Sequence, residues 1–464
     1  NLLRIHSRTG DVLMSTVAKK IMMGSGATAA SAYEIEQSLI FDEASDSSMN
    51  RTFGSGGNRK TWTYSTWFKR VNGGSIGNLL LGYTDGGGPW QQSAITIGQN
   101  GYIGFFDDKG GTSTNVKTNR LLRDPAAWYH LVYALDTTQG TAANRIKIYV
   151  NGVQETSFST ANYPGQNAQP YFNSAALHTI ALGNTYNCSQ YMAETNFIDG
   201  TALTPSSFGE TKSATGQWIP KEYEGSYGTT GFYLKMASGA IGTDSSGNSN
   251  TFGTTNLANS DVVIDTPTNN FSTLNPLDFV GTNGTISEGN LKGVGGNYPA
   301  KIFASTIAAS SGKWYAEFTQ AQNQYPLLGV ADANLFKSLH NTGGIRGSGA
   351  VTWDLGSTQG RYFINSTTET TSSGKGNNGD VIQVAIDADS RKVWFGINNT
   401  WKNAGSNAGN PAAGTYQIGV VDNTGPLLFF MRPEDTTQTA NFGQKTFAYT
   451  PPSGFSALST ANLP

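Results

Sequence analysis

Short runs in which apolar and polar residues alternate recur along most of the chain. The first series includes "KTWTYSTWFKRV", "SAITIGQNGYIGFF", "AWYHLVYALD" and "NRIKIYVNGVQETSF", and each run has the length of a strand. Each run ends at Gly, Asn or Asp, the residues that favour turns. Helical spacing is nearly absent, except in "TPSSFGE", where we expect a single turn that begins at a Thr or Ser cap. The pattern predicts an all-β protein.

Two dipeptides predict where hairpins turn. Asn100-Gly101 lies inside "AITIGQNGYIGFF", and Asn151-Gly152 lies inside "RIKIYVNGVQE". Asn-Gly is the preferred pair for two-residue turns, because both positions need a positive φ that matches the twist of the strands. We therefore expect a two-residue hairpin turn at each pair.

The apolar density falls between two alternating series. Gly, Ser, Asn and Thr dominate residues 237–275, after which runs such as "GKWYAEFTQ", "DVIQVAIDA" and "PLLFFMRP" begin. The first 35 residues are small and polar without sustained periodicity. We therefore expect an extended N-terminal arm (1–35), a first β-sandwich (36–236), a linker (237–275) and a second β-sandwich (276–464).

Composition and charge exclude several classes of function. The chain has 464 residues, of which 57 are Gly and only 13% are charged, as suits strands joined by many turns. The net charge is −2 and the basic residues are scattered, so we expect no nucleic-acid partner. The apolar runs are far shorter than the ~20 residues of a membrane-spanning helix, so we expect no membrane insertion.

The single cysteine, Cys188, excludes an intrachain disulfide. The stretch before Gly24 has an apolar run too short for the core of a signal peptide, which needs ~7 residues or more. We therefore do not expect secretion by that route.

Two families resemble successive parts of the chain. The stretch "AAWYHLVYALDTTQGTAANRIKIYVNGVQETSF", followed by "MAETNFIDGTALTPSSFGE", resembles the laminin-G-like branch of the concanavalin A-like jelly rolls over about residues 36–235. The motifs "SSGKWYAEFT", "LLGVADA", "GDVIQVAIDADSRKVWFGINNTWKN" and "LLFFMRP" resemble the SPRY domain over about residues 290–450. The resemblances imply two tandem β-sandwich domains of the jelly-roll type.

The combination resembles a group of bacteriophage proteins identified as tail-fibre or other virion structural components. It comprises the arm "KKIMMGSGA", the segment "YEIEQSLIFDEASDSSMNRTFGSGGNRKTWTYSTWFKRV" and the linker "DTPTNNFSTLNP" before a SPRY-like domain. This resemblance implies a location in the virion after assembly in the host cytoplasm. It also implies a homo-oligomer whose arm contacts other virion proteins and whose sandwiches contact a host-surface glycan or protein.

Asp387 and Asp389, in "AIDADSR", form the most conspicuous pair of carboxylates. The alternating residues on either side predict a hairpin whose tip carries both side chains. Glycosidases need two carboxyl groups that flank a substrate in a cleft, at ~5 to 9.5 Å from each other. We therefore interpret the pair as turn residues, with a counterpart at Asp136 in the first domain.

The loop "TDSSGNSN" is the best candidate for a metal site. Asp244, Asn248 and Asn250 offer hard oxygen ligands of the kind that Ca²⁺ accepts, and the turn resembles one found in laminin-G-like proteins. The same letters also make an ordinary turn, and the full EF-hand pattern is absent. No cofactor is required by the sequence, and Ca²⁺ is the one candidate.

Other reactive residues lack the context that their chemistry needs. Ser75 in "GGSIG" matches a nucleophile elbow, but both flanks are predicted strands rather than a strand and a helix. "GSGATA" matches a dinucleotide fingerprint only in its letters. His130 is interpreted as a packed strand residue that shares a face with Trp128 and Val132, and Cys188 as a small buried hydrophobe.

Aromatic residues among turn residues are the candidate ligand contacts. Trp90, Tyr163, Tyr171 and Trp401 lie outside the alternating runs. Aromatic faces stack on sugars or anchor protein partners, but the same residues could instead cap the sandwiches or pack against another subunit, which is the preferred interpretation.

We therefore predict a non-enzymatic virion structural protein, either a tail fibre or a capsid decoration, that presents its β-sandwiches for host adhesion. A Ca²⁺-assisted, lectin-like carbohydrate-binding protein is the alternative. A glycan-cleaving enzyme is a third and less favoured class.

Overall fold

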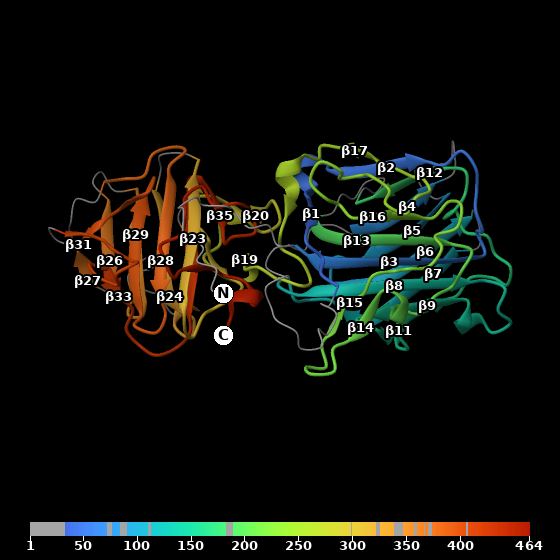
Figure 1. Ribbon diagram of the computed structural model, residues 1–464, viewed down its shortest axis with the longest axis horizontal. Coiled ribbons are helices and arrows are strands. Elements are labelled where there is room, and N and C mark those ends of the chain that lie inside the picture. Colours follow the sequence, from blue (N-terminus) through green and yellow to red (C-terminus); the bar gives the residue numbers. More distant parts are fainter. Residues whose placement is uncertain are drawn as a thin grey trace, which may run out of the picture. The chain divides into compact units, whose positions relative to one another are not determined.

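The computed structural model describes residues 33–71, 77–83, 91–109, 113–181, 189–297, 299–321, 325–337, 347–356, 360–365, 367–369, 374–404 and 407–464. Within these ranges the regular elements are strands and short 3-10 helices, which confirms the all-β prediction (Figure 1). None of the helices in this part of the chain is long and apolar enough to cross a membrane. The arm predicted over residues 1–35 lies almost entirely outside the described residues.

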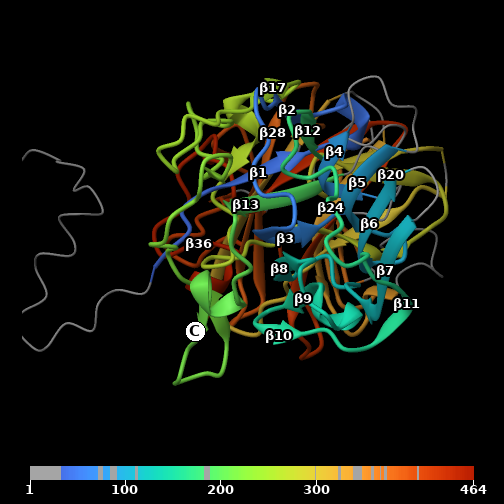
Figure 2. The ribbon, with the colours of Figure 1, turned by 90° about the vertical axis from the view of Figure 1, so that its right-hand side faces the viewer.

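The first sandwich consists of two facing antiparallel sheets (Figure 2). The strand order of one sheet, sheet A below, is β10-β9-β8-β3-β13-β1-β18, and β16 also pairs with β13. Its strands are β1 (Ser38–Phe41), β3 (Thr61–Arg70), β8 (Trp128–Asp136), β9 (Ile146–Val150), β10 (Val153–Gln154), β13 (Gln190–Asp199), β16 (Phe232–Leu234) and β18 (Val262–Val263).

The facing sheet, sheet B, has the order β11-β7-β6-β5-β4-β12-β2-β17. Its strands are β2 (Ser48–Thr52), β4 (Gly77–Tyr83), β5 (Gln91–Ile97), β6 (Tyr102–Lys109), β7 (Ser113–Leu121), β11 (Phe158–Asn162), β12 (Leu177–Ile180) and β17 (Gly253–Thr255). The short elements outside these sheets are the hairpin of β14 (Gly209–Thr211) and β15 (Trp218–Pro220), with η1 (Glu43–Ser45), η2 (Ala142–Asn144), η3 (Pro205–Ser207) and η4 (Asn259–Asp261). The single turn expected in "TPSSFGE" is η3.

Alternation along β3 places successive side chains on opposite faces of sheet A. Trp62, Tyr64 and Phe68 are buried in the core between the two sheets. Burial of side chains of this size contributes roughly 1.5–3 kcal/mol each, which makes this core the main stabilising term. The intervening residues, which include Trp67 and Lys69, face away from that core.

The two predicted hairpin turns have different geometries. At Asn151-Gly152 both residues have positive φ (48° and 81°), and Val150 pairs directly with Val153, so the predicted two-residue turn is confirmed. The turn at Asn100-Gly101 is longer, because the Gly98 N–H donates to the Tyr102 carbonyl and only Gly101 (φ 96°) is left-handed. The two-residue prediction was therefore wrong there, since a longer loop needs only one positive φ at its Gly.

Residues 237–275, the predicted linker, add strands to both sheets of the first sandwich. β17 pairs with β2 in sheet B, and β18 pairs with β1 in sheet A. The polar composition of this segment reflects its many turns. Its two short strands and a few buried side chains attach it to the first sandwich.

The second sandwich also has two sheets, with the orders β19-β22-β34-β24-β25-β26-β27 and β20-β21-β35-β23-β28-β29-β30. β33 pairs with β29, and β36 pairs with β23. The first sheet contains β19 (Leu274–Val280), β22 (Ile302–Ser305), β24 (Tyr325–Asp332), β25 (Ala350–Asp354), β26 (Arg361–Ile364), β27 (Thr367–Glu369) and β34 (Leu427–Glu434).

The second sheet contains β20 (Gly284–Ser287), β21 (Lys292–Gly295), β23 (Lys313–Gln320), β28 (Val381–Asp387), β29 (Lys392–Ile397), β30 (Thr400–Trp401), β33 (Gly419–Val420), β35 (Thr437–Asn441) and β36 (Ser456–Ala457). The remaining elements are the hairpin of β31 (Asn403–Ala404) and β32 (Asn407–Ala408), and η6 (Thr460–Asn462). The alternation in "VIQVAIDADSRKVWFGI" gives the predicted hairpin of β28 and β29, with Ile382, Val384 and Ile386 in the core between the sheets.

Candidate functional site

A cleft of about 680 Å³ lies on the outer face of sheet A. Its walls come from β3, β8, the β9–β10 turn, the β14–β15 hairpin, residues 267–270 and residues 460–461. The lining residues are Trp67, Trp128, Asn151, Gly216, Gln217, Trp218, Pro267, Thr268, Asn270, Thr460 and Ala461. The volume falls in the range of roughly 300–1,000 Å³ that is usual for small-ligand sites.

The cleft exists because the outer face of sheet A is only partly covered. Along β8 this face carries Trp128, His130, Val132 and Ala134, as the sequence predicted for the first three. Val132 and Ala134 pack under Phe208 in a small second core. This cover stops short of the other end of β8, so Trp128 lines the cleft.

His130 connects two of the three tryptophans. Its ring stacks on Trp67 with centroids 4.8 Å apart, and its Nδ1 accepts a hydrogen bond from the Trp218 indole N–H at 3.0 Å. Since Nδ1 is an acceptor, the neutral ring carries its proton on Nε2, which lies 2.9 Å from the Ser65 hydroxyl. Burial lowers the pKa of His130 to about 3, so the ring is neutral at ordinary pH. The prediction of a packed, hydrogen-bonded strand histidine is confirmed.

Two glycines fix the position of Trp218. A Cβ atom at Gly152 would lie 2.6 Å from the Trp218 ring, and a Cβ atom at Gly209 would lie 2.5 Å from it. Gly152 also has a φ of 81°, which side chains rarely adopt. Backbone from the β9–β10 turn and from β14 therefore packs directly against the indole, which leaves the ring few alternative orientations.

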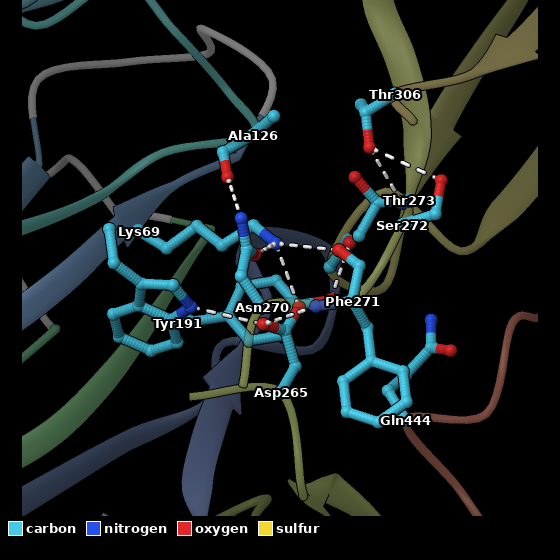
Figure 3. Close-up of polar contacts among 12 residues, drawn as sticks. Lys69, Ala126, Tyr191, Asp265, Asn270, Phe271, Ser272, Thr273, Thr306 and Gln444 are labelled. Carbon is cyan, nitrogen blue, oxygen red and sulfur yellow. Dashed lines mark hydrogen bonds and ion pairs between the residues drawn. The ribbon is translucent and has the colours of Figure 1, made fainter. Parts of the chain in front are cut away.

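Asp265 positions Trp128, the tryptophan on the other side of the cleft, by accepting a hydrogen bond from its indole N–H at 3.0 Å. The Asp265 carboxylate also accepts a hydrogen bond from the Lys69 ammonium at 2.8 Å (Figure 3). Lys69 also donates to the Asn270 side-chain oxygen at 2.8 Å. The Lys69 and Asp265 side chains are both 0% exposed, so this ion pair is fully desolvated. The pair ties residues 265–270 to sheet A and thereby builds one wall of the cleft.

The predicted aromatic contacts do not converge on this cleft. Tyr163 packs partly buried against the core of the first sandwich, and Trp401 packs against a small cluster around Trp394. Tyr171 lies under the Arg59 guanidinium, 5.9 Å from it. These contacts favour packing, while ligand binding at the three residues stays a prediction. Trp90 lies outside the described residues.

The Asp244 loop is a tightly bonded turn. The Asp244 carboxylate accepts hydrogen bonds from the backbone N–H groups of Tyr233, Ser246 and Asn250 and from the Ser246 hydroxyl, at 2.7–2.9 Å. Asn248 donates its side-chain amide to the carbonyls of Gly228 and Gly231. These bonds give the residues a structural role in the turn.

Asn250, the remaining candidate ligand of that loop, is already bonded to an arginine side chain. The side-chain oxygen of Asn250 accepts a hydrogen bond from the Arg51 guanidinium at 2.8 Å. Among the residues that the structure describes, no group of three or more His, Cys, Asp and Glu side chains is placed to hold a metal ion. Binding of Ca²⁺ at Asp244, Asn248 and Asn250 stays a prediction.

The Asp387 and Asp389 side chains differ in burial, so the expectation that both lie at an exposed tip was wrong for one of them. Asp387 is only 9% exposed, because it ends β28 directly between Lys313 and Lys392 on the neighbouring strands. Asp389 is exposed and accepts a hydrogen bond from the Gly312 N–H. Both carboxylates therefore make local contacts that stabilise the hairpin and its neighbouring strand.

The other turn carboxylate, Asp136, has a similar local role. Burial opposes its ionised form, but hydrogen bonds from Thr138 and Gln139 more than offset this, and the pKa of Asp136 is lowered. Ser75 and Cys188 lie outside the described residues.

Sequence reasoning missed Trp67, Trp128 and Trp218 as candidate contacts. Trp67 and Trp128 lie within alternating runs and are 4% and 8% exposed, so the pattern correctly indicated burial. Trp218, in "TGQWIP", lies among turn residues, and the criterion that selected Trp401 would also have selected it. That the three converge depends on strand pairing, which places Trp67 opposite His130.

Comparisons with known proteins agree with this architecture. Residues 45–194 match the family model described as the concanavalin A-like lectin/glucanases superfamily. A comparison with curated protein sequences gave no match.

Solved structures of low sequence identity resemble parts of the chain. The TRIM65 PSpry domain is 14% identical, with 37% of this chain and 92% of that chain covered and a TM-score of 0.28. A heptameric SAP-like pentraxin from Limulus polyphemus is 13% identical, with coverages of 37% and 80% and a TM-score of 0.29. A putative carbohydrate binding protein from Bacteroides ovatus is 17% identical, with coverages of 48% and 60% and a TM-score of 0.32. The protein is thus an all-β chain of two successive β-sandwiches, and residues 45–194 of the first match the concanavalin A-like lectin/glucanases superfamily model.

Proposed function

We propose that the protein is a non-enzymatic structural component of a bacteriophage particle, in a tail fibre or as a capsid decoration, and that it binds glycans of the host surface. The observation that carries the glycan-binding part is the cleft lined by Trp67, Trp128 and Trp218. Indole rings bury apolar C–H surface of a sugar at low entropic cost, while side-chain amides on the same walls can bond its hydroxyls.

The match of residues 45–194 supports a carbohydrate-related role, since the name of that superfamily covers lectins and glucanases. Binding rather than cleavage is favoured because no carboxylate lines the cleft in the described part of the chain. Glycosidases that work with two carboxyl groups need both beside the scissile bond.

The particle-borne part of the proposal rests on the resemblance of the arm, the linker and the order of the two sandwiches to phage virion proteins. Many copies on one particle would make weak individual sites sufficient, because multivalent attachment raises the effective affinity by orders of magnitude.

A glycan array probed with the purified chain tests the glycan-binding part. We expect binding that Trp218→Ala weakens at least about tenfold, as for an aromatic residue that carries much of a binding site. Tyr449→Ala, which removes an aromatic side chain of the second sandwich outside the cleft, is the matched control and should bind as the parent does. Unchanged binding by Trp218→Ala, or release of reducing ends from the bound glycan, would refute glycan binding without cleavage at this cleft.

Purified particles test the structural role. We expect the chain at a fixed copy number per particle by quantitative mass spectrometry, and loss of incorporation when residues 1–32 are deleted. If the chain is found only outside particles, the structural role is refuted, and the lectin-like carbohydrate-binding protein is the remaining proposal.

A further inference from the structure

We propose that the cleft selects uncharged glycans, and that the Trp67 indole N–H, the Asn151 amide and the Gln217 amide bond the sugar hydroxyls. This inference rests on the proposed glycan binding and names the class of ligand and the residues that recognise it. It follows from the charge of the walls and from the hydrogen-bonding groups that remain open on them.

The walls of the cleft carry no charged side chain among the described residues. The nearest charges in the network behind it, Lys69 and Asp265, neutralise each other at 2.8 Å and are both 0% exposed. An acidic sugar that entered the cleft would lose hydration without gaining a cationic partner, which is strongly unfavourable. Neutral sugars lose only hydroxyl hydration, which amide groups can replace.

The polar groups of the cleft divide into those already bonded and those still open. The indole N–H groups of Trp128 and Trp218 are bonded to Asp265 and His130, so these two rings can offer a ligand only their carbon surface. Both ends of the Asn270 amide are also engaged, by Lys69 and by the Ala126 carbonyl. These residues therefore shape the cleft but have no free N–H donor for a ligand.

Three side chains on three separate elements keep nitrogen donors open among the described residues of the cleft. Among the described residues, the Trp67 indole N–H has no hydrogen-bond partner although the side chain is 4% exposed. Asn151 uses its Oδ1 to accept from the His130 N–H at 2.7 Å, which leaves its Nδ2 donors open. Gln217 forms no side-chain hydrogen bond within the described part of the chain. The Trp67 nitrogen is not among the fully buried polar atoms that lack a partner, so it is accessible to solvent or to a ligand.

The arrangement of these groups matches a polyhydroxylated ligand. Trp67 comes from β3, Asn151 from the β9–β10 turn and Gln217 from the β14–β15 hairpin, so a ligand must fill the cleft to reach all of them. Two of the three are donors that are held in place, Trp67 by stacking on His130 and Asn151 by its own bond to β8. A preorganised set of this kind discriminates well, because little side-chain entropy is lost on binding.

The test compares neutral and acidic oligosaccharides on a glycan array and then measures affinities by calorimetry for the best neutral one. Trp67→Phe keeps the aromatic packing and removes only the N–H. Asn151→Asp keeps the acceptor for His130 and the tolerance of positive φ but removes the donors. Gln217→Ala removes an exposed amide. We expect each to weaken binding roughly fivefold to tenfold, which corresponds to one hydrogen bond.

Gln154→Ala, an exposed glutamine on the neighbouring edge strand and outside the cleft, is the matched control and should bind as the parent does. Melting curves of all variants show whether a loss of affinity is a loss of folding. Preference for acidic glycans, or unchanged affinity in all three folded variants while Trp218→Ala abolishes binding, would overturn the proposed recognition but leave glycan binding in place. Absence of any glycan binding would refute both proposals.

Discussion

Removal of one partner of the Lys69–Asp265 ion pair should destabilise the first sandwich severely. Both side chains are 0% exposed, and the Asp265 carboxylate also accepts hydrogen bonds from Trp128 and, at 3.3 Å, from the Phe271 N–H. Asp265→Asn leaves the Lys69 ammonium buried beside neutral oxygens only. Breaking a buried pair in this way costs about 3–5 kcal/mol.

The expected change in melting temperature follows from the size of the domain. For domains of 150–250 residues, 1 kcal/mol shifts the midpoint by roughly 2–4 °C, so Asp265→Asn should lower it by roughly 6–20 °C. Calorimetry gives the melting midpoint, and fluorescence-detected denaturation with urea gives the free energy of unfolding.

An exposed ion pair of the same type provides the control. Lys292 and Glu288 lie 2.8 Å apart but are 34% and 45% exposed, so Lys292→Met should cost about 1 kcal/mol or less. The double variant Lys69→Met with Asp265→Asn should recover part of the stability, because no unpaired charge remains buried. Two results would contradict the argument for a desolvated, coupled pair. One is a loss of stability in the single variants as small as that of Lys292→Met, and the other is a loss in the double variant equal to the sum of the two single losses.

Three further predictions concern the same sandwich. The unfolded His130 ring takes up a proton near its usual pKa of 6.5, whereas the folded ring does so only near 3, so the unfolded state binds more protons between these values. Stability should therefore fall by about 1.4 kcal/mol for each unit by which the pH falls through this window. His130→Gln should reduce the slope of the urea-derived free energy of unfolding against pH by the equivalent of one proton. An unchanged slope in this variant would contradict the prediction. Gly152→Ala should lower the melting temperature and weaken glycan binding, because its Cβ would collide with Trp218; a variant with parental melting and affinity would count against the packing described. Addition of a chelator should leave the melting curve unchanged, because the Asp244 carboxylate already accepts four hydrogen bonds; a lower midpoint that Ca²⁺ restores would instead support the calcium site.

The strands and their faces could be predicted from local information. Alternation has a period of two in any strand, so the runs in "VIQVAIDADSRKVWFGI" indicated both the hairpin and its core residues before any pairing was known. The turn at Asn151-Gly152 was predictable for the same reason, since it depends on two adjacent residues. The longer loop at Asn100-Gly101 was not, because the same dipeptide occurs in both kinds of turn.

The candidate site could not be predicted in this way. The cleft combines residues from 67 to 461, which only pairing of strands far apart in the chain brings together. The sequence also could not show that Asp265, in a segment of linker composition, neutralises a lysine almost 200 positions earlier in the chain.

By itself, the sequence determined that this protein is all-β, that it has two sandwiches, and which face of each run enters a core, because these properties depend on neighbouring residues. Only the tertiary structure decided which tryptophans meet, which of their N–H groups stay open, and that the walls of the cleft lack charge. Those properties depend on contacts between distant segments, and the pattern of apolar and polar residues is the same whichever segments meet.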